Sequence, residues 1–132
     1  MSTLFTKIIQ REIPGHFVWE DEQAVVIMTI APIQAGHVLV IPRQEVDHWD
    51  DLPDALAAHL MSVAKTVAKS LKQAFACERV SLMIVGLEVP HTHLHLVPIN
   101  TMADAHFGNA KMADQADLAA AAEKIRAALA AA

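Results

Sequence analysis

Short apolar runs separated by polar turns dominate the first forty residues of the chain. β-Branched residues fill many of these runs, and this composition is typical of strands. Proline or glycine stands beside several runs, and both residues interrupt regular structure. The pattern predicts a short helix over 4–10, then strands over 17–20, 24–30 and 37–42, of which the first two form a hairpin.

A helical spacing begins at Leu52-Pro53-Asp54. Apolar residues then recur every three or four positions as far as Phe75, with Ser62 and three lysines between them. This spacing places the apolar side chains on one face of a helix of about six turns. Two further strands, over 80–85 and 91–97, and an alanine-rich helix over 114–129 complete the pattern. The order predicts an α+β fold: a five-stranded, mostly antiparallel sheet with one long helix and a C-terminal helix.

Composition narrows the class of protein further. The chain has 132 residues, of which 54% are hydrophobic and 19% charged, so it can bury one core and is not disordered. We expect residues 1–132 to form a single domain. The net charge is −5 without a basic cluster, which argues against binding to a nucleic-acid polymer. The single cysteine allows no intrachain disulfide. Without a signal-peptide core or a membrane-spanning run, we expect a cytoplasmic protein that has no membrane partner.

Three histidines at alternate positions, His91, His93 and His95, mark the predicted last strand. Residues two apart in a strand share a face, so this spacing predicts three imidazoles on one surface. His37 starts another predicted strand and is a candidate fourth member. Imidazole can act as a nucleophile, a proton donor or acceptor, or a metal ligand. The pattern by itself therefore leaves two functions open, a metal site or the transfer of a phosphoryl or nucleotidyl group.

The run His91-Thr92-His93-Leu94-His95-Leu96-Val97 resembles the signature of the histidine-triad (HIT) superfamily. Histidine and apolar residues alternate in it, and it ends in two apolar residues. Residues 5–14, 19–22 and 30–42 are also similar to family segments in the same order. The resemblance extends from about Phe5 to Pro98, fades over 100–132, and is closest to the Hint-like small HIT proteins.

This resemblance implies a HIT fold and a nucleotide hydrolase or transferase that uses no metal and no other cofactor. By analogy, His93 attacks the α-phosphate of a nucleoside phosphoramidate or a dinucleoside polyphosphate, and water then releases a nucleoside monophosphate from the covalent histidyl-nucleotide. His95 and His37 contact phosphate oxygens, and His91 orients the site. The resemblance also implies a homodimer joined through the fourth strand and the long helix. It places six residues at the base-and-ribose pocket: Phe5, Ile8, Ile27, Thr29, Ile30 and Leu39.

The chain departs from the family pattern around the expected phosphate site. Thr29 stands where relatives usually carry an aspartate, and a threonine offers the ribose no two-oxygen anionic acceptor. The connection over 85–90 is short, and Leu87 replaces a common glutamine. Glu88 replaces a small polar residue. Either Glu88 turns away from the site, or it accepts a proton or binds a cationic leaving group such as an amine, because a carboxylate repels phosphate.

Two other classes of function remain open at this point. The first is a metal-dependent hydrolase that uses His37, His91, His93 or His95 as ligands, although only Glu88 offers a nearby carboxylate. The second is a module that binds a nucleotide or a protein partner and has lost catalysis, a reading that the altered connection supports. The natural substrate and the base preference stay open.

Overall fold

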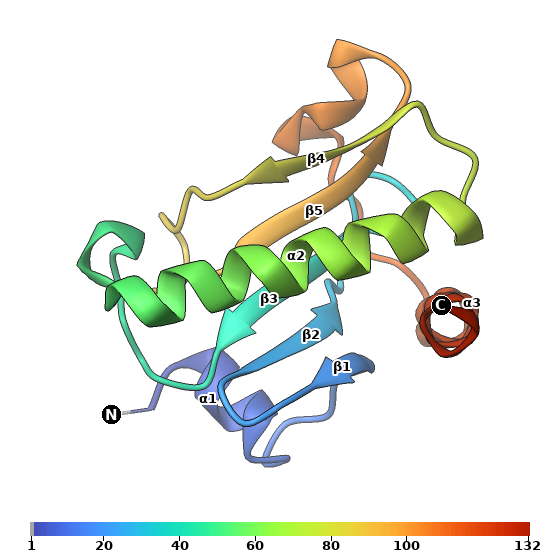
Figure 1. Ribbon diagram of the computed structural model, residues 1–132. Helices are drawn as coiled ribbons and strands as arrows, with labels where there is room; N and C mark the ends of the chain where they lie inside the picture. Colours follow the sequence, from blue (N-terminus) through green and yellow to red (C-terminus); the bar gives the residue numbers. More distant parts are fainter. Residues whose placement is uncertain (1) are drawn as a thin grey trace.

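A single antiparallel sheet organises the protein, whose computed structural model describes residues 2–132 (Figure 1). Its five strands lie in the order β1-β2-β3-β5-β4, and every neighbouring pair is antiparallel. The α+β prediction is therefore confirmed. The elements are α1 (Leu4–Ile9), β1 (Phe17–Glu20), β2 (Ala24–Met28), β3 (Val38–Pro42), α2 (Asp54–Ala74), β4 (Arg79–Met83), β5 (Leu94–Ile99) and α3 (Gln115–Ala131), with short 3₁₀ turns over Trp49–Asp51, Met102–Ala105 and Phe107–Asn109.

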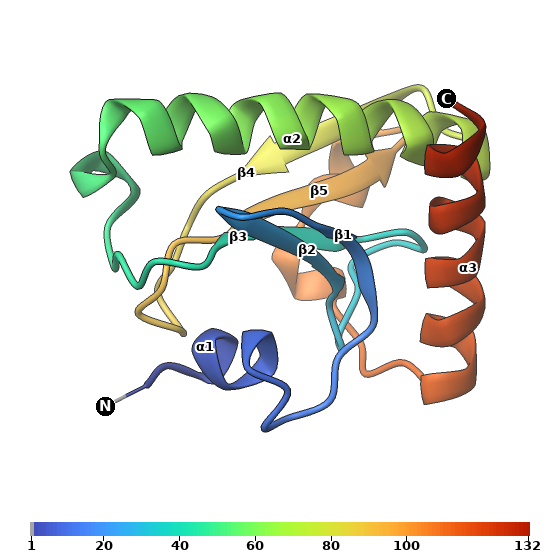
Figure 2. The ribbon, with the colours of Figure 1, turned by 60° about the horizontal axis from the view of Figure 1, so that its bottom comes forward.

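The two helices α2 and α3 form the larger core with one face of the sheet. In Figure 2, α2 lies along this face and α3 stands at one end of the sheet. The apolar face of α2 is buried as its spacing predicts, and Leu60, Val67 and Leu71 are almost fully covered. Alternate residues of the strands point to the same side, because strand side chains alternate between faces. Val26, Val40, Leu94 and Leu96 are examples.

The opposite face carries a smaller apolar cluster under α1. Phe5 of α1 packs there with Val25, Ile27, Leu39 and Ile41. Figure 2 shows α1 on the side of the sheet away from α2. Thr3 caps this short helix, and its hydroxyl oxygen accepts the backbone N–H of Thr6 at 3.1 Å. The sheet is therefore covered on both faces, which explains why β2 and β3 are buried along their whole length.

The start of the last strand differs from the sequence prediction. β5 begins at Leu94, so His91 and His93 lie in an extended segment before the strand and not within it. This segment is anchored to a loop, because the backbone N–H and the hydroxyl of Thr92 both donate to the Val46 carbonyl, each at 2.7 Å. The alternation of side chains persists without strand pairing. Among residues 2–132, no helix is long and apolar enough to cross a membrane.

The segment over residues 100–111 is more structured than its polar sequence suggests. Two 3₁₀ turns form it, and a capping box at Thr101 and Asp104 opens the first. The Asp104 carboxylate accepts the backbone N–H groups of Asn100 and Thr101 at 2.9 and 3.0 Å. These contacts explain how a chain without apolar periodicity adopts a definite path beside β5.

Candidate active site

His91 is the most deeply buried of the three alternating histidines and is bonded at both ring nitrogens. Its Nε2–H donates to the Pro42 carbonyl at 2.7 Å. A carbonyl oxygen only accepts, so in the neutral ring Nδ1 is the acceptor. The Thr3 hydroxyl donates to that Nδ1 at 2.7 Å. His91 thus joins the end of β3 to the cap of α1, and neither nitrogen is free for a substrate.

His93 has one bonded nitrogen and one open nitrogen. Its Nδ1–H donates to the backbone carbonyl of His91 at 2.7 Å, which leaves Nε2 unprotonated in the neutral ring. Every buried side-chain nitrogen and oxygen within residues 2–132 has a hydrogen-bond partner. Because Nε2 of His93 has none, it reaches the accessible surface. The Phe5 ring meets the His93 ring edge-on, with centroids 4.8 Å apart, and holds its orientation.

His95 of β5 and His37, the residue just before β3, form a hydrogen-bonded pair. The backbone N–H of Ile33 donates to Nδ1 of His37 at 3.0 Å, so the His37 proton is on Nε2. That Nε2–H donates to Nδ1 of His95, also at 3.0 Å. The His95 proton is therefore on Nε2, and this group is a hydrogen-bond donor. Starting from one backbone N–H, the chain of bonds fixes the tautomer of the second ring.

All four imidazoles favour their neutral form. Burial lowers the pKa of His37 to about 3, with help from His95 and His93. Burial also lowers the pKa of His95 to about 4, and the nearby His93 adds to this shift. The pKa values of His91 and His93 are lowered by burial too, although a hydrogen bond to a backbone carbonyl opposes the shift in each case. At neutral pH the cluster thus offers one lone pair on His93 and one N–H donor on His95.

These two open nitrogens belong to rings that line a common cavity. Its volume is about 280 Å³, and the centroids of the two rings are 4.9 Å apart. The connection between β4 and β5 and the turn over Phe107–Asn109 form the other walls. The Phe107 ring meets the His95 ring edge-on, with centroids 4.9 Å apart. The cavity is lined by Val85, Gly86, Leu87, Glu88, His93, His95 and Phe107.

The bonding of the rings does not suit a three-histidine metal site. Both nitrogens of His91 and both of His37 are engaged. A metal ion needs a ring lone pair from each ligand, and His93 is the one ring of the four that offers it without losing a hydrogen bond. Within residues 2–132, no group of three or more His, Cys, Asp or Glu side chains is arranged to hold a metal ion.

Four of the six residues predicted for a base-and-ribose pocket lie together under α1, and none of the six lines this cavity. Phe5, Ile27 and Leu39 are buried in the apolar cluster under α1, and Ile8 packs against it. Thr29 is half-buried, and its hydroxyl accepts the N–H of Ala31 at 3.4 Å. The remaining one, Ile30, is 55% exposed. Glu88, which the sequence singled out as a departure from the family pattern, does line the cavity.

Sequence reasoning overlooked three contributors to the site. Thr3 holds His91, Phe107 packs on His95, and Val85 lines the cavity. Phe107 is an aromatic residue inside a polar segment, and that contrast was a usable signal. Thr3 shows no such signal, since its contact joins residues 88 positions apart.

Comparison with known proteins places these features in a family. The HIT domain model matches residues 10–102. An uncharacterized HIT-like protein of Methanocaldococcus jannaschii is 35% identical over 99 residues, which span 72% of this chain and 77% of that protein. The adenosine 5′-monophosphoramidase of Saccharomyces cerevisiae is 33% identical over 96 residues, which span 72% of this chain and 61% of the yeast protein.

A solved structure gives the same result for the fold. A zinc-bound histidine triad family protein from Mycobacterium smegmatis superposes with a TM-score of 0.86 at 28% identity. The alignment covers 99% of this chain and 95% of that chain, so it includes α3 and the segment over 100–111. The sequence resemblance is weakest there, yet the fold continues to match.

Proposed function

Because the chain belongs to the HIT family, we propose that it hydrolyses a nucleotide at its α-phosphate through a covalent bond to His93. One observation supports this proposal above all. His93 presents an unprotonated Nε2 at a cavity while its Nδ1–H is held by a backbone carbonyl at 2.7 Å. A neutral imidazole with a fixed tautomer is a competent nucleophile at neutral pH.

In the proposed first step, Nε2 of His93 forms a bond to phosphorus and the bond to the leaving group breaks. The attacking ring gains positive charge, and the hydrogen bond from Nδ1 to the His91 carbonyl stabilises it. Nε2–H of His95 donates to a phosphate oxygen, where negative charge develops. In the second step water attacks phosphorus, His93 leaves as the neutral ring, and a nucleoside monophosphate departs.

His37 and His91 then act through their neighbours. Nε2–H of His37 donates to Nδ1 of His95 and so keeps the His95 proton on Nε2. The backbone carbonyl of His91 accepts the hydrogen bond from Nδ1–H of His93. The His91 ring holds this carbonyl in place, because the ring is hydrogen-bonded to Pro42 and Thr3. Orientation of this kind contributes to rate by holding the reacting groups in a productive geometry. The resemblance assigned His37 to a phosphate oxygen, but its ring is only 2% exposed and lies behind His95.

A nucleoside phosphoramidate is the substrate class that we favour over a dinucleoside polyphosphate. The relative from yeast carries the name adenosine 5′-monophosphoramidase. The cavity beside His93 contains a carboxylate, and a polyphosphate leaving group would be repelled by it. We place the nucleoside on the other side of the histidines, near the predicted base-and-ribose residues.

Trapping the intermediate tests the proposal directly. The protein is mixed with adenosine 5′-phosphoramidate, quenched in base to preserve the phosphorus–nitrogen bond, and digested for mass spectrometry. We expect an added adenylyl group on the peptide that contains His93, and no such group in His93→Ala. Rapid turnover by His93→Ala would refute the covalent step. Tight nucleotide binding without any turnover by the unmodified protein would instead favour a binding module.

A metal-dependent hydrolysis is the competing function, and the similar structure from Mycobacterium smegmatis is described as zinc-bound. In this chain such a site would require His91 or His37 to give up a hydrogen bond. We expect full phosphoramidase activity in protein that has been dialysed against EDTA and measured as metal-free by elemental analysis. Loss of activity with EDTA, restored by zinc, would support the competing function.

We propose further that two copies pair through β4. This strand lies at the edge of the sheet (Figure 1), and an edge strand has unpaired backbone groups that can bond to a second chain. Leu82 pairs with Leu96 and so faces the α2 side, where Met61 of α2 is 54% exposed. Light scattering after gel filtration should give twice the chain mass. A charge introduced by Leu82→Lys should shift the protein toward a monomer.

A further inference from the structure

The cavity beside His93 and His95 has one charged side chain in its wall. Glu88 supplies it, and the apolar residues Val85, Leu87 and Phe107 surround it. Leu87 is 90% exposed and Val85 50%, so apolar surface stands open at the mouth of the cavity. Glu88 is exposed as well. Its charge acts on His93, where it opposes the lowering of the pKa by burial.

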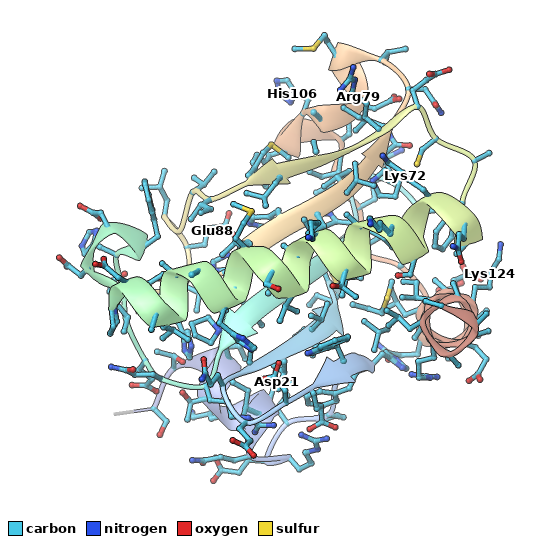
Figure 3. The ribbon with its side chains drawn as sticks, in the orientation of Figure 1. Asp21, Lys72, Arg79, Glu88, His106 and Lys124 are labelled. Atoms are coloured by element: carbon cyan, nitrogen blue, oxygen red, sulfur yellow. The ribbon has the colours of Figure 1, made fainter. Side chains whose placement is uncertain are left out.

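Positive charge is missing from the same wall. Among residues 2–132, no lysine or arginine lines this cavity, and the two histidines in it are neutral at pH 7 because burial lowers their pKa values. In Figure 3, Glu88 lies on the connection between β4 and β5, far from the labelled Lys72, Arg79 and Lys124. A group that leaves from phosphorus into this cavity thus meets a carboxylate and carbon atoms.

From this juxtaposition we propose that Glu88 selects an amine leaving group with an apolar chain and a positive charge. The carbon chain of the amine packs on Leu87, Val85 and Phe107, and its cationic end faces the Glu88 carboxylate. An anionic leaving group is rejected by the same carboxylate. This inference rests on the proposed function, and it assigns Glu88 the choice of leaving group.

The chemical step is consistent with that assignment. Nε2 of His93 forms a bond to phosphorus, and the phosphorus–nitrogen bond breaks with its electron pair going to nitrogen. The nitrogen takes one proton from a water molecule at the mouth of the cavity and departs as an amine, and the hydroxide that remains attacks phosphorus in the second step. At neutral pH an alkylamine takes up a further proton and is a cation, as a lysine side chain is.

Three matched substrates measure the effect of charge alone. Each is an adenosine 5′-phosphoramidate whose nitrogen carries a five-carbon chain, and the chain ends in an ammonium, a methyl or a carboxylate group. In water, the attraction between two opposite unit charges about 4 Å apart changes a rate or binding constant by about fivefold, relative to a pair in which one partner is neutral. We expect kcat/KM to fall about fivefold from the ammonium to the methyl substrate and about fivefold again to the carboxylate substrate.

Variants at Glu88 should change this order. Glu88→Gln should bring the three kcat/KM values to within about twofold of one another, and Glu88→Lys should reverse the order. Glu78→Gln is the matched control, because it removes the same charge just before the opposite end of β4, beyond Arg79. It should leave the original order in place. Added salt should reduce the differences among the three kcat/KM values of the unmodified protein, since exposed charges are screened.

The outcomes separate this inference from the function on which it rests. Equal rates for the three substrates, or an order that survives in Glu88→Gln, would overturn the role of Glu88 and leave the His93 reaction standing. Failure of the unmodified protein to cleave any of the three, while it still cleaves adenosine 5′-phosphoramidate, would overturn the role of Glu88 alone. Failure on adenosine 5′-phosphoramidate as well would overturn both. An order that is lost in Glu88→Gln and kept in Glu78→Gln would establish that Glu88 selects the leaving group.

Discussion

The two faces of the sheet differ in what covers them and in what they contribute. On the α2 side of the described chain, 17 buried apolar residues form one continuous core. On the other side the buried apolar cluster has five residues, and the histidine segment occupies the rest of the face. Both faces come from the same strands, because alternate residues of a strand point in opposite directions. The larger apolar core and the histidine cluster thus lie on opposite faces.

The largest expected effect separates activity from stability on the histidine face. His93→Ala removes the proposed nucleophile and should lower kcat/KM for adenosine 5′-phosphoramidate by at least about 10³-fold. The free energy of unfolding should change by much less than a core truncation changes it, since the ring lines a cavity. His48→Ala, which removes an exposed histidine, is the control. Comparable activity losses in the two variants would argue against the division between faces.

The reverse separation is expected on the α2 side. Leu60 of α2 is 1% exposed in the larger core, and Leu60→Ala should lower the free energy of unfolding by about 2–5 kcal/mol. Urea denaturation measures this loss. Ser62→Ala, which changes an exposed residue of the same helix, should cost less than about 1 kcal/mol. At a temperature where Leu60→Ala stays folded, its kcat should match that of the unmodified protein. A large drop in kcat would show that the faces are coupled.

A smaller effect should follow from loss of the hydrogen bond behind His95. His37→Leu removes both the donor to His95 and the acceptor of the Ile33 N–H, and we expect kcat to fall about 10- to 100-fold. His37→Gln, which can donate and accept, should retain more activity. Nitrogen NMR of the His95 ring should show a mixture of tautomers in His37→Leu. A single unchanged tautomer would contradict the positioning role.

The smallest effect per step is a dependence of stability on pH. The folded protein holds the pKa of His37 at about 3 and that of His95 at about 4, below the ordinary histidine value, so between these values the unfolded chain binds more protons. The free energy of unfolding should have its full value above about pH 6.5. Below this pH it should fall, by up to about 1.4 kcal/mol per pH unit for each histidine.

Denaturation curves from pH 7.5 to 5 check this dependence, and two variants assign it to a face. His37→Leu should reduce the slope, because one titrating group is gone. Leu60→Ala should shift the whole curve without changing its slope, since leucine has no titratable group. If His37→Leu leaves the slope of the free energy of unfolding against pH unchanged, the proton uptake belongs to groups other than His37.

Features that depend on residues close together in the sequence could be predicted from it, and features that depend on contacts between distant residues could not. The α2 helix, the strands and the sheet class were predictable, because spacing of apolar residues is a local signal. The grouping of His91, His93 and His95 on one side was predictable for the same reason, although β5 starts only at Leu94. The strand start was missed because Thr92 bonds to Val46 in a distant loop.

The finer features of the site depend on contacts between distant residues. His37 and His95 are 58 positions apart, and Thr3 and His91 are 88 apart. No local pattern reports such pairs, so the tautomers and the free nitrogen of His93 could be known only from the fold. Glu88 was singled out by sequence as a departure from the family pattern. Its presence in the cavity wall, surrounded by apolar side chains, required the structure.

The bond between Thr3 and His91 has a practical consequence for preparing the protein. Thr3 also donates its backbone N–H to the Glu45 carboxylate at 2.8 Å, so Thr3 belongs to the scaffold around the proposed nucleophile. A purification tag fused ahead of Ser2 would begin only two residues before Thr3. An affinity tag is better attached after Ala132, which follows α3 and lies far from α1 (Figure 2). Assays on amino-terminally tagged material should be repeated after the tag is cleaved.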